Sequence, residues 1–265
     1  MGFSGSPIFH IYQSHKVKQK GTFYHMYYIL KQNVNWSIEM LLEEGAAALR
    51  KFIGIEFGLI FSQDELLIIK KSPGKGIVGQ LIEKLIGLPN SPKTLDFDDG
   101  EMKTNQSNRD GSPAETMFIT QILSQIDHIL AKQPFSQTSL FKKSRNMLLV
   151  PIYKSKSVPV EKWMILPPIH VDLKDIKWRQ LVVDFEEDYL KICDGLNNEI
   201  LSSPDGFIHT TNGKFIQVRS KDSKPYSPIY SKKYGKYVSN KNHAFYFQKS
   251  FMKHLQESSL DYPFY

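Results

Sequence analysis

Apolar residues along this chain recur at helical spacing in some stretches and form short runs in others. The stretches with apolar positions three and four residues apart span residues 38–53, 75–87, 114–131, 173–196 and 248–257. The short runs, typical of strands, span residues 65–70, 101–104, 146–153, 162–166, 214–219 and 245–247. Helices and strands follow one another in mixed order, which predicts an α/β protein with a central sheet.

The composition narrows the class of protein. Hydrophobic residues make up 41% and charged residues 23% of the 265 residues, as in soluble globular proteins. No apolar run approaches the roughly 18 residues that cross a bilayer, and residues 1–9 lack the pattern of a signal peptide. The single cysteine, Cys193, excludes an intrachain disulfide and zinc sites built from several cysteines. We therefore expect a cytoplasmic protein without a membrane partner.

Basic residues are concentrated near the C-terminal end of the sequence. Residues 214–253 hold ten basic residues and one acidic residue, Asp222, so the net charge of this segment is +9. The remaining residues have a net charge of −2, which gives +7 for the whole sequence. Five tyrosines are interleaved with these charges, which is unusual for a solvated linker. The segment indicates a surface for a polyanion, with a lysine-rich solvated loop as the alternative.

The segment from Thr94 to Thr104 contains the candidate catalytic chemistry. Glu101 and Lys103 are two residues apart, so a strand places both side chains on one face, and Asp96 lies five residues upstream across a turn. Two carboxylates on neighbouring backbone can bind Mg²⁺, while a lysine orients water and stabilises charge on a phosphate. Acid-x-Lys is common by chance, so an exposed turn and strand is the alternative. Asp98 and Asp99 compete with Asp96 as ligands.

Two neighbouring segments give this motif a context. A Lys-Gly-x-x-Gly-x-x-x-Glu motif runs from Lys75 to Glu83 on the helix predicted over 75–87. An Asp-Phe turn and a Gly-Glu-x-Lys-Thr strand follow it. This arrangement resembles the MutH family of DNA endonucleases. The resemblance implies that Asp96, Glu101 and Lys103 are catalytic, with Asp96 and Glu101 on the metal. It also implies that Glu83 supports the metal site and that Lys75 lies near the DNA backbone.

Residues 139–145 form a basic segment before a strand that ends at a proline, as in the same family. The resemblance implies a second catalytic lysine here, which we assign to Lys143, with Lys142 or Arg145 as alternatives because the alignment can slip. A charged entry to the strand, without catalytic function, is the other interpretation of this segment.

The C-terminal part also resembles the family. Residues 213–221 are similar to a strand that ends in Gln-x-Arg-Pro-Lys, which implies that Arg219, Ser220 and Lys221 bind DNA, with Ser220 in place of the usual proline. Arginine can donate two hydrogen bonds to one guanine edge. Residues 244–249 resemble a Phe-Tyr-Leu-Lys segment, which implies that Tyr246 helps to read the sequence. A core position between two phenylalanines is the alternative for Tyr246.

The resemblance implies a restriction-endonuclease-like (PD-(D/E)xK) fold, with a central mixed sheet flanked by helices and two lobes around a DNA cleft. We expect an N-terminal region of unknown role over residues 1–70 and an endonuclease domain over residues 71–260. Within that domain we expect a catalytic lobe over about 71–155 and a DNA-recognition lobe over about 156–260.

The predicted function is that of a type II restriction endonuclease, which hydrolyses double-stranded DNA at a short sequence with Mg²⁺. GATC is the sequence that the resemblance suggests. Such an enzyme cuts both strands, which favours a homodimer on DNA, and it implies a cognate DNA methyltransferase as a functional partner. The alternatives are a mismatch-repair nicking endonuclease of the same family and a non-catalytic DNA-binding protein on the same fold.

Overall fold

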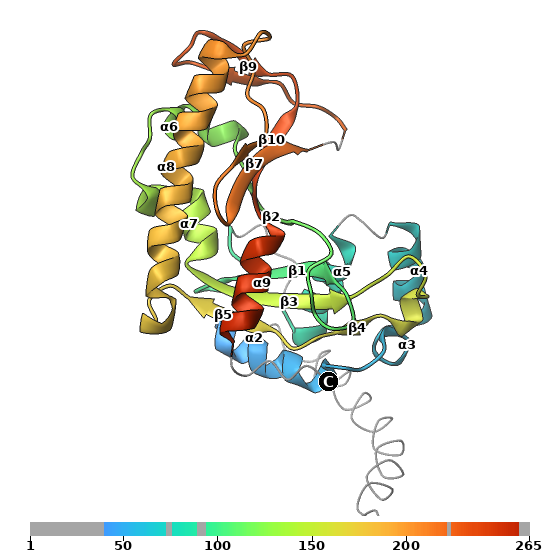
Figure 1. The fold of residues 1–265 in the computed structure, drawn as a ribbon. Helices are drawn as coiled ribbons and strands as arrows, with labels where there is room; N and C mark the ends of the chain where they lie inside the picture. Colours follow the sequence, from blue (N-terminus) through green and yellow to red (C-terminus); the bar gives the residue numbers. More distant parts are fainter. Residues whose placement is uncertain (1–39, 73–75, 89–93, 222–223, 260–265) are drawn as a thin grey trace, which may run out of the picture. The chain divides into compact units, whose positions relative to one another are not determined.

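Figure 1 shows the computed structural model of the chain, which describes residues 40–72, 76–88, 94–221 and 224–259. Contacts within the chain divide it into two compact units, Met1–Ile38 and Glu39–Tyr265. All elements below belong to the second unit. In the described part of the chain, no helix combines the length and the apolar character that a membrane span requires.

The first sheet is built around β3, Asn146–Tyr153, which is buried along most of its length. β1 (Glu101–Ser107) pairs with β3 in parallel, with Glu101 opposite Met147. β4 (Met164–Ile165) and β5 (Ile169–Asp172) pair with β3 antiparallel. A strand covered on both faces requires a nearly continuous apolar run, and residues 147–152 provide it. The strands predicted over 101–104, 146–153 and 162–166 are thereby confirmed.

Four helices share a core with this sheet: α2 (Leu42–Leu49), α3 (Phe57–Ile60), α4 (Gln63–Lys71) and α5 (Ile77–Ile86). The helix predicted over 38–53 is shorter as α2 and continues into a 3₁₀ turn, and the helix predicted over 75–87 is confirmed as α5. α5 ends at Gly87, which adopts a left-handed conformation with φ of 94°.

The strand predicted over residues 65–70 is wrong, because these residues lie within α4. Ser62 caps this helix: its hydroxyl accepts the N–H of Glu65, and the Glu65 carboxylate accepts the N–H of Ser62 in return. Leu66 and Ile69, three residues apart, face the core while the two residues between them are exposed. The apolar run therefore reflects one side of a helix together with two exposed apolar positions.

The second sheet is antiparallel, with the strand order β2 (Met117–Gln121), β10 (Asn242–Phe247), β7 (Ile216–Lys221) and β6 (Thr211–Asn212). β7 and β10 confirm two predicted strands. A separate hairpin consists of β8 (Ile229–Ser231) and β9 (Lys236–Ser239). The helices around this sheet are α6 (Ile126–Leu130), α7 (Ser139–Ser144), α8 (Arg179–Ser202) and α9 (Lys249–Ser258). Short 3₁₀ turns span Arg50–Phe52, Leu123–Gln125, Phe135–Gln137, Val160–Lys162 and Ile176–Trp178.

The helix predicted over residues 114–131 is also wrong, because its first half is strand β2 and only its second half is helix α6. Met117 and Ile119 are buried while Phe118 between them is 37% exposed, and this alternation suits a strand paired with β10. The helix predicted over 173–196 is confirmed in its main part, since α8 begins at Arg179 and continues to Ser202. The predicted C-terminal helix is confirmed as α9.

The predicted organisation into residues 1–70, 71–155 and 156–260 stays a prediction. In the structure, helices α2 to α4 pack in the same hydrophobic cluster as residues of β1 and β3. β4 and β5 belong to the first sheet, although they follow residue 155 in the sequence. A second hydrophobic cluster lies between the second sheet and α8.

One buried carboxylate ties α8 to the second sheet. Asp188, 3% exposed, accepts the backbone N–H groups of Phe215 at 2.7 Å and Ile216 at 2.8 Å, and also that of Lys214. These bonds satisfy backbone donors at the start of β7 that the sheet does not pair. Asp188 therefore sets where β7 begins relative to α8.

We predict that Asp188→Ala lowers the free energy of unfolding by about 3 kcal/mol, because buried N–H groups lose their acceptor. Urea unfolding followed by circular dichroism measures this loss. Glu187→Ala, an exposed neighbour on α8, is the matched control and should change stability by less than about 0.5 kcal/mol. Equal effects of the two substitutions would contradict the assignment.

Candidate active site

The turn before β1 places Asp96 beside the first residues of the strand. Asp96 Oδ2 accepts the backbone N–H of Met102 at 2.9 Å. The turn closes tightly at Gly100: a Cβ atom there would lie 2.5 Å from Leu42 Cδ1 and 2.8 Å from the carbonyl oxygen of Asn146. Only glycine fits this close approach, which brings Asp96 next to Glu101.

Asp99 has a structural function in this turn. Its Oδ1 accepts the backbone N–H of Leu42 at the start of α2 at 2.9 Å, and Asn146 Nδ2 donates to its carbonyl oxygen at 3.1 Å. Asp98 is exposed. Asp96 instead accepts the N–H of Met102, next to Glu101, and burial and the charge of Glu101 both raise the pKa of Asp96. The geometry therefore favours Asp96 over its two neighbours as the partner of Glu101.

Two lysines converge on one oxygen of Glu101. Glu101 is 1% exposed, and its Oε1 accepts from Lys103 Nζ on the same strand and from Lys143 Nζ on α7 at 2.8 Å. α7 is capped by Thr138, whose hydroxyl accepts the N–H of Phe141, so its orientation is set locally. Of the three basic residues in the segment 142–145, Lys143 is the one with a described contact to Glu101. The structure thus brings together Glu101, Lys103 and Lys143 as the sequence predicts.

Glu83 and Asp96 complete an acidic cluster around the start of β1. Burial raises the pKa of Asp96, Glu101 raises it further, and Lys103 and Lys143 oppose the rise. Burial likewise raises the pKa of Glu83, and Asp96 and Glu101 add to this effect against Lys103. Gly79 on α5 lets the helix come close to β1 here, since a Cβ atom would lie 3.3 Å from Thr104 Oγ1.

The predicted recognition residues lie on the second sheet. Arg219 Nη1 donates to Thr116 Oγ1 at 3.2 Å, and its guanidinium lies 5.0 Å from the centre of the Tyr246 ring. Lys221 Nζ lies 5.1 Å from the centre of the Phe118 ring, which meets Tyr246 edge to face. These five side chains form one partly exposed group, which we call the reading face.

Tyr246 belongs to this face because of strand alternation. Phe245 and Phe247 are at most 1% exposed and point into the core, which turns Tyr246 to the other side of β10. The alternative of a core position for Tyr246 is therefore wrong. Ser220 pairs with His243 and alternates away from Arg219 and Lys221, so it is not part of the reading face. Lys75 lies outside the described residues.

Sequence reasoning missed Thr116 and Phe118. Both lie where a helix was predicted, and helical spacing does not place them opposite Tyr246. The signal that could have found them is the alternation of buried Met117 and Ile119 with exposed Phe118.

Residues 87–184 match the family model of MutH, the DNA mismatch repair enzyme. Through this segment the chain is similar to the MutH family. This match confirms the resemblance seen in the sequence, and it supports a restriction-endonuclease-like fold and a nuclease that acts on DNA. No curated protein matches the chain. Asp96, Glu101, Lys103 and Lys143 lie within the matched segment, whereas Glu83 and the reading-face residues of β7 and β10 lie outside it.

The described side chains near Glu101 do not form a complete set of metal ligands by themselves. In the described parts of the chain, no group of three or more His, Cys, Asp or Glu side chains is gathered as a metal site. Glu101 Oε2, however, is buried without a hydrogen-bond partner, and Asp96 lies beside it. Mg²⁺ is commonly held by one or two carboxylates together with water and substrate phosphates. The donor set fits such an ion if DNA and water supply the remaining ligands.

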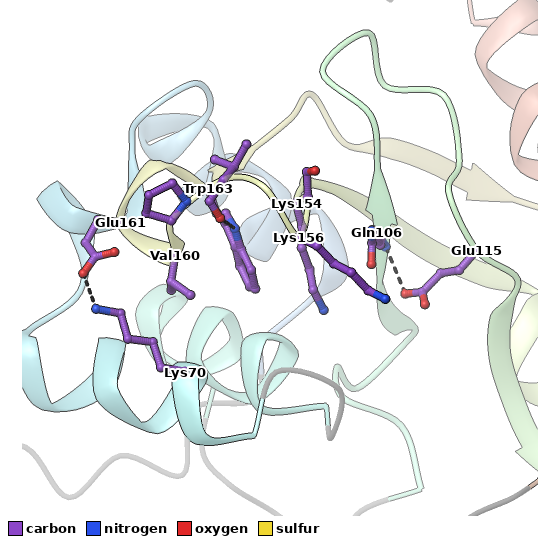
Figure 2. Close-up of a pocket in the computed structure, with 11 residues that line it drawn as sticks. Lys70, Gln106, Glu115, Lys154, Lys156, Val160, Glu161 and Trp163 are labelled. Atoms are coloured by element: carbon purple, nitrogen blue, oxygen red, sulfur yellow. Dashed lines mark hydrogen bonds and ion pairs between the residues drawn. The ribbon is translucent and has the colours of Figure 1, made fainter.

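A pocket of about 630 Å³ lies away from these residues, between the end of α4 and the segment 154–163 (Figure 2). Lys154 Nζ lies 5.1 Å from the centre of the Trp163 ring along its wall, and Glu161 pairs with Lys70. None of the predicted catalytic or DNA-binding residues lines this pocket. It is therefore separate from the acidic cluster and from the reading face.

We predict that Asp96→Asn raises the melting temperature at pH 7 in EDTA. A carboxyl with a raised pKa in the folded state costs stability once it is ionised, so stability falls as the pH rises from the ordinary value, 3.8, through the folded pKa. The amide removes this cost above that range. Calorimetry at pH 4 and pH 7 measures the effect, which should be larger at pH 7. A lower melting temperature at pH 7 than that of the unchanged protein would contradict the assignment.

Proposed function

We propose that the protein is a type II restriction endonuclease that cuts both strands of DNA at a short sequence with Mg²⁺. The observation that carries this proposal is the convergence of Asp96, Glu101, Lys103 and Lys143 within a segment of the MutH family. A PD-(D/E)xK fold with two lobes around the DNA belongs to the same proposal. GATC is the first recognition sequence to test.

The chemistry follows from the charges around Glu101. When bound, Mg²⁺ activates water and stabilises negative charge on the scissile phosphate. Asp96 and Glu101 would hold the ion, and Glu83 would support these carboxylates from α5. Lys103 orients the attacking water and stabilises the transition state. Lys143 on α7 neutralises part of the charge of Glu101. Without this compensation, three carboxylates would repel a phosphate.

DNA recognition rests on the reading face. Arg219 is held by Thr116 and by the Tyr246 ring, so its guanidinium is oriented before DNA binds. A pre-oriented arginine loses less conformational entropy when it binds a guanine edge. Not all of the basic segment contacts DNA in this proposal, because Lys214 pairs with Asp184 and Lys233 donates to Leu130 and Asn197.

A restriction enzyme cuts both strands, so we propose a homodimer on a palindromic site and a cognate DNA methyltransferase as a functional partner in the cytoplasm. The main alternative is a nicking enzyme, as the description of the family model names mismatch repair. A non-catalytic DNA-binding protein is the weaker alternative, since binding alone does not require a buried glutamate beside an ionisable aspartate.

The test is incubation of the purified protein with unmethylated plasmid, with Mg²⁺ and with EDTA, followed by mapping of the ends. We expect magnesium-dependent double-strand cuts at one short sequence. Lys103→Ala should lower the cleavage rate by at least about 100-fold while specific binding is retained, since it removes charge stabilisation in the transition state. Nicks alone would favour the mismatch-repair alternative. DNA that is bound and left intact by the unchanged protein would favour the non-catalytic one.

Arg219→Ala should weaken binding to the specific sequence by about 1–3 kcal/mol and binding to random DNA much less, because a bidentate contact to one base is lost. Fluorescence anisotropy with both duplexes at one salt concentration measures the difference. Arg179→Ala, an exposed arginine at the start of α8, is the matched control. If both duplexes lost affinity equally, Arg219 would be a phosphate contact.

A further inference from the structure

A cationic cluster lies between β7 and the β8–β9 hairpin. Residues 224–241 lie between β7 and β10, and we call them the insertion. Lys224 and Lys241 are its first and last residues, and each has its Nζ 5.9 Å from the centre of the Tyr226 ring. Tyr226 is 41% exposed, so two ammonium groups lie near one aromatic ring that is partly open to solvent. We call these three residues the Tyr226 cluster.

The cluster is held in place by the first residue of β10. Asn242 Oδ1 accepts the N–H of Ser227 at 2.9 Å, and Asn242 Nδ2 donates to the carbonyl of Pro225 at 3.2 Å. Asn242 is paired with Lys221 across the sheet. The backbone on both sides of Tyr226 is therefore fixed at the end of the strand pair that carries Lys221 and the reading face.

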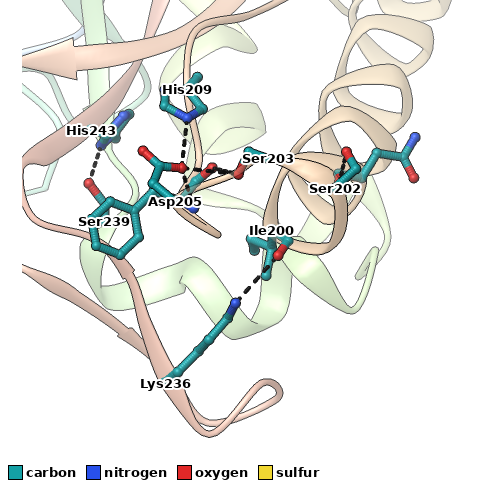
Figure 3. A network of polar contacts seen from close by, with 10 residues as sticks. Ile200, Ser202, Ser203, Asp205, His209, Lys236, Ser239 and His243 are labelled. Atoms are coloured by element: carbon teal, nitrogen blue, oxygen red, sulfur yellow. Dashed lines mark hydrogen bonds and ion pairs between the residues drawn. The ribbon is translucent and has the colours of Figure 1, made fainter.

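The hairpin beyond the cluster is fixed as well. Asp127 accepts from Ser231 Oγ at 2.7 Å and from two backbone N–H groups of the hairpin turn. Figure 3 shows two further contacts of β9, in which Lys236 reaches the carbonyl of Ile200 and Ser239 lies against His243. The insertion is thus a packed element, and the positions of Lys224 and Lys241 at its two ends are defined.

The charge of this element identifies the chemistry of its ligand. Residues 224–241 contain five lysines and four tyrosines and no aspartate or glutamate. Lysine is a compact charge without the fork of arginine, so it binds a phosphate oxygen without reading the base. Two lysines near one solvent-exposed ring suit the phosphodiester backbone of a duplex, which presents successive phosphates along each strand.

We propose that the Tyr226 cluster binds the phosphate backbone of duplex DNA beside the sequence that the reading face contacts. This inference rests on the proposed function, in that it takes DNA as the substrate and the reading face as the recognition surface. The cluster extends the contact beyond the recognition sequence and adds affinity without specificity. Asn242, which bonds the backbone on both sides of Tyr226, pairs with Lys221 and so joins the cluster to the strand end that carries part of the reading face.

The test is the salt dependence of binding to a duplex with long flanks and to one trimmed to the recognition sequence, both in EDTA. Each lysine–phosphate contact adds about 0.9 to the slope of log affinity against log salt. The Lys224→Gln/Lys241→Gln variant should therefore lower the slope by about 2 on the long duplex and change it little on the trimmed one. Specific and random long duplexes should lose affinity by the same factor.

Two controls make the result specific to the cluster. Lys174→Gln/Lys191→Gln removes the same charge from exposed positions outside the insertion, and it should leave the slope within about 0.5 of the original value. Lys224→Arg/Lys241→Arg keeps the charges and should bind like the unchanged protein. Melting temperatures within about 1 °C of the original confirm that each variant is folded.

An unchanged slope in the Lys224→Gln/Lys241→Gln variant, or an equal fall in the Lys174→Gln/Lys191→Gln control, would overturn the inference. So would a fall of the same size on the trimmed duplex. Cleavage by the unchanged protein is measured separately, so these outcomes leave the proposed nuclease standing. If the unchanged protein bound no DNA in this assay, the proposed function and the inference would both fail.

Discussion

Glu101 is buried at the start of β1, and its charge requires partners that the strand alone does not supply. Lys103 reaches it from the same strand, while Lys143, which lies 42 residues further along the chain, reaches it from α7. A buried carboxylate without such compensation is strongly destabilising. The ion pairs at Oε1 therefore link α7 to the start of β1 through a single oxygen atom. The second oxygen, which has no partner, is where a cation or its water would be accommodated.

The first sheet is joined to the reading face by a short stretch of chain. β1 leads through residues 108–116 directly into β2, and Thr116 at the end of this connection holds Arg219. Gln256 on α9 donates to the carbonyl of Gly111 in the same connection. Arg219, which we propose contacts bases, and the carboxylates near β1 are therefore attached to one connected segment of the chain. In the proposed function, this segment links DNA recognition to the acidic cluster.

Much of this arrangement could be predicted from the sequence, for reasons that differ from residue to residue. Glu101 and Lys103 share a strand face because side chains alternate with a period of two, and Phe245 and Phe247 turn Tyr246 outward by the same rule. The helix ending at Gly87 follows from local stop signals. The errors over 65–70 and 114–131 arose because short apolar runs suit a strand or one side of a helix equally well, and capping or sheet pairing decides between them.

The sequence alone determined which residues of a strand or helix share a face, because side chains follow a fixed period. The positions of the acidic and basic residues and the motifs that resemble the MutH family are also properties of the sequence. Only the tertiary structure decided that Asp99 anchors α2 and that Lys143, among the basic residues of segment 142–145, reaches Glu101. It also decided that Thr116 and Phe118 contact Arg219 and Lys221. These contacts join residues far apart in the sequence. They depend on how helices and strands pack together, and periodicity along the chain contains no information on that packing.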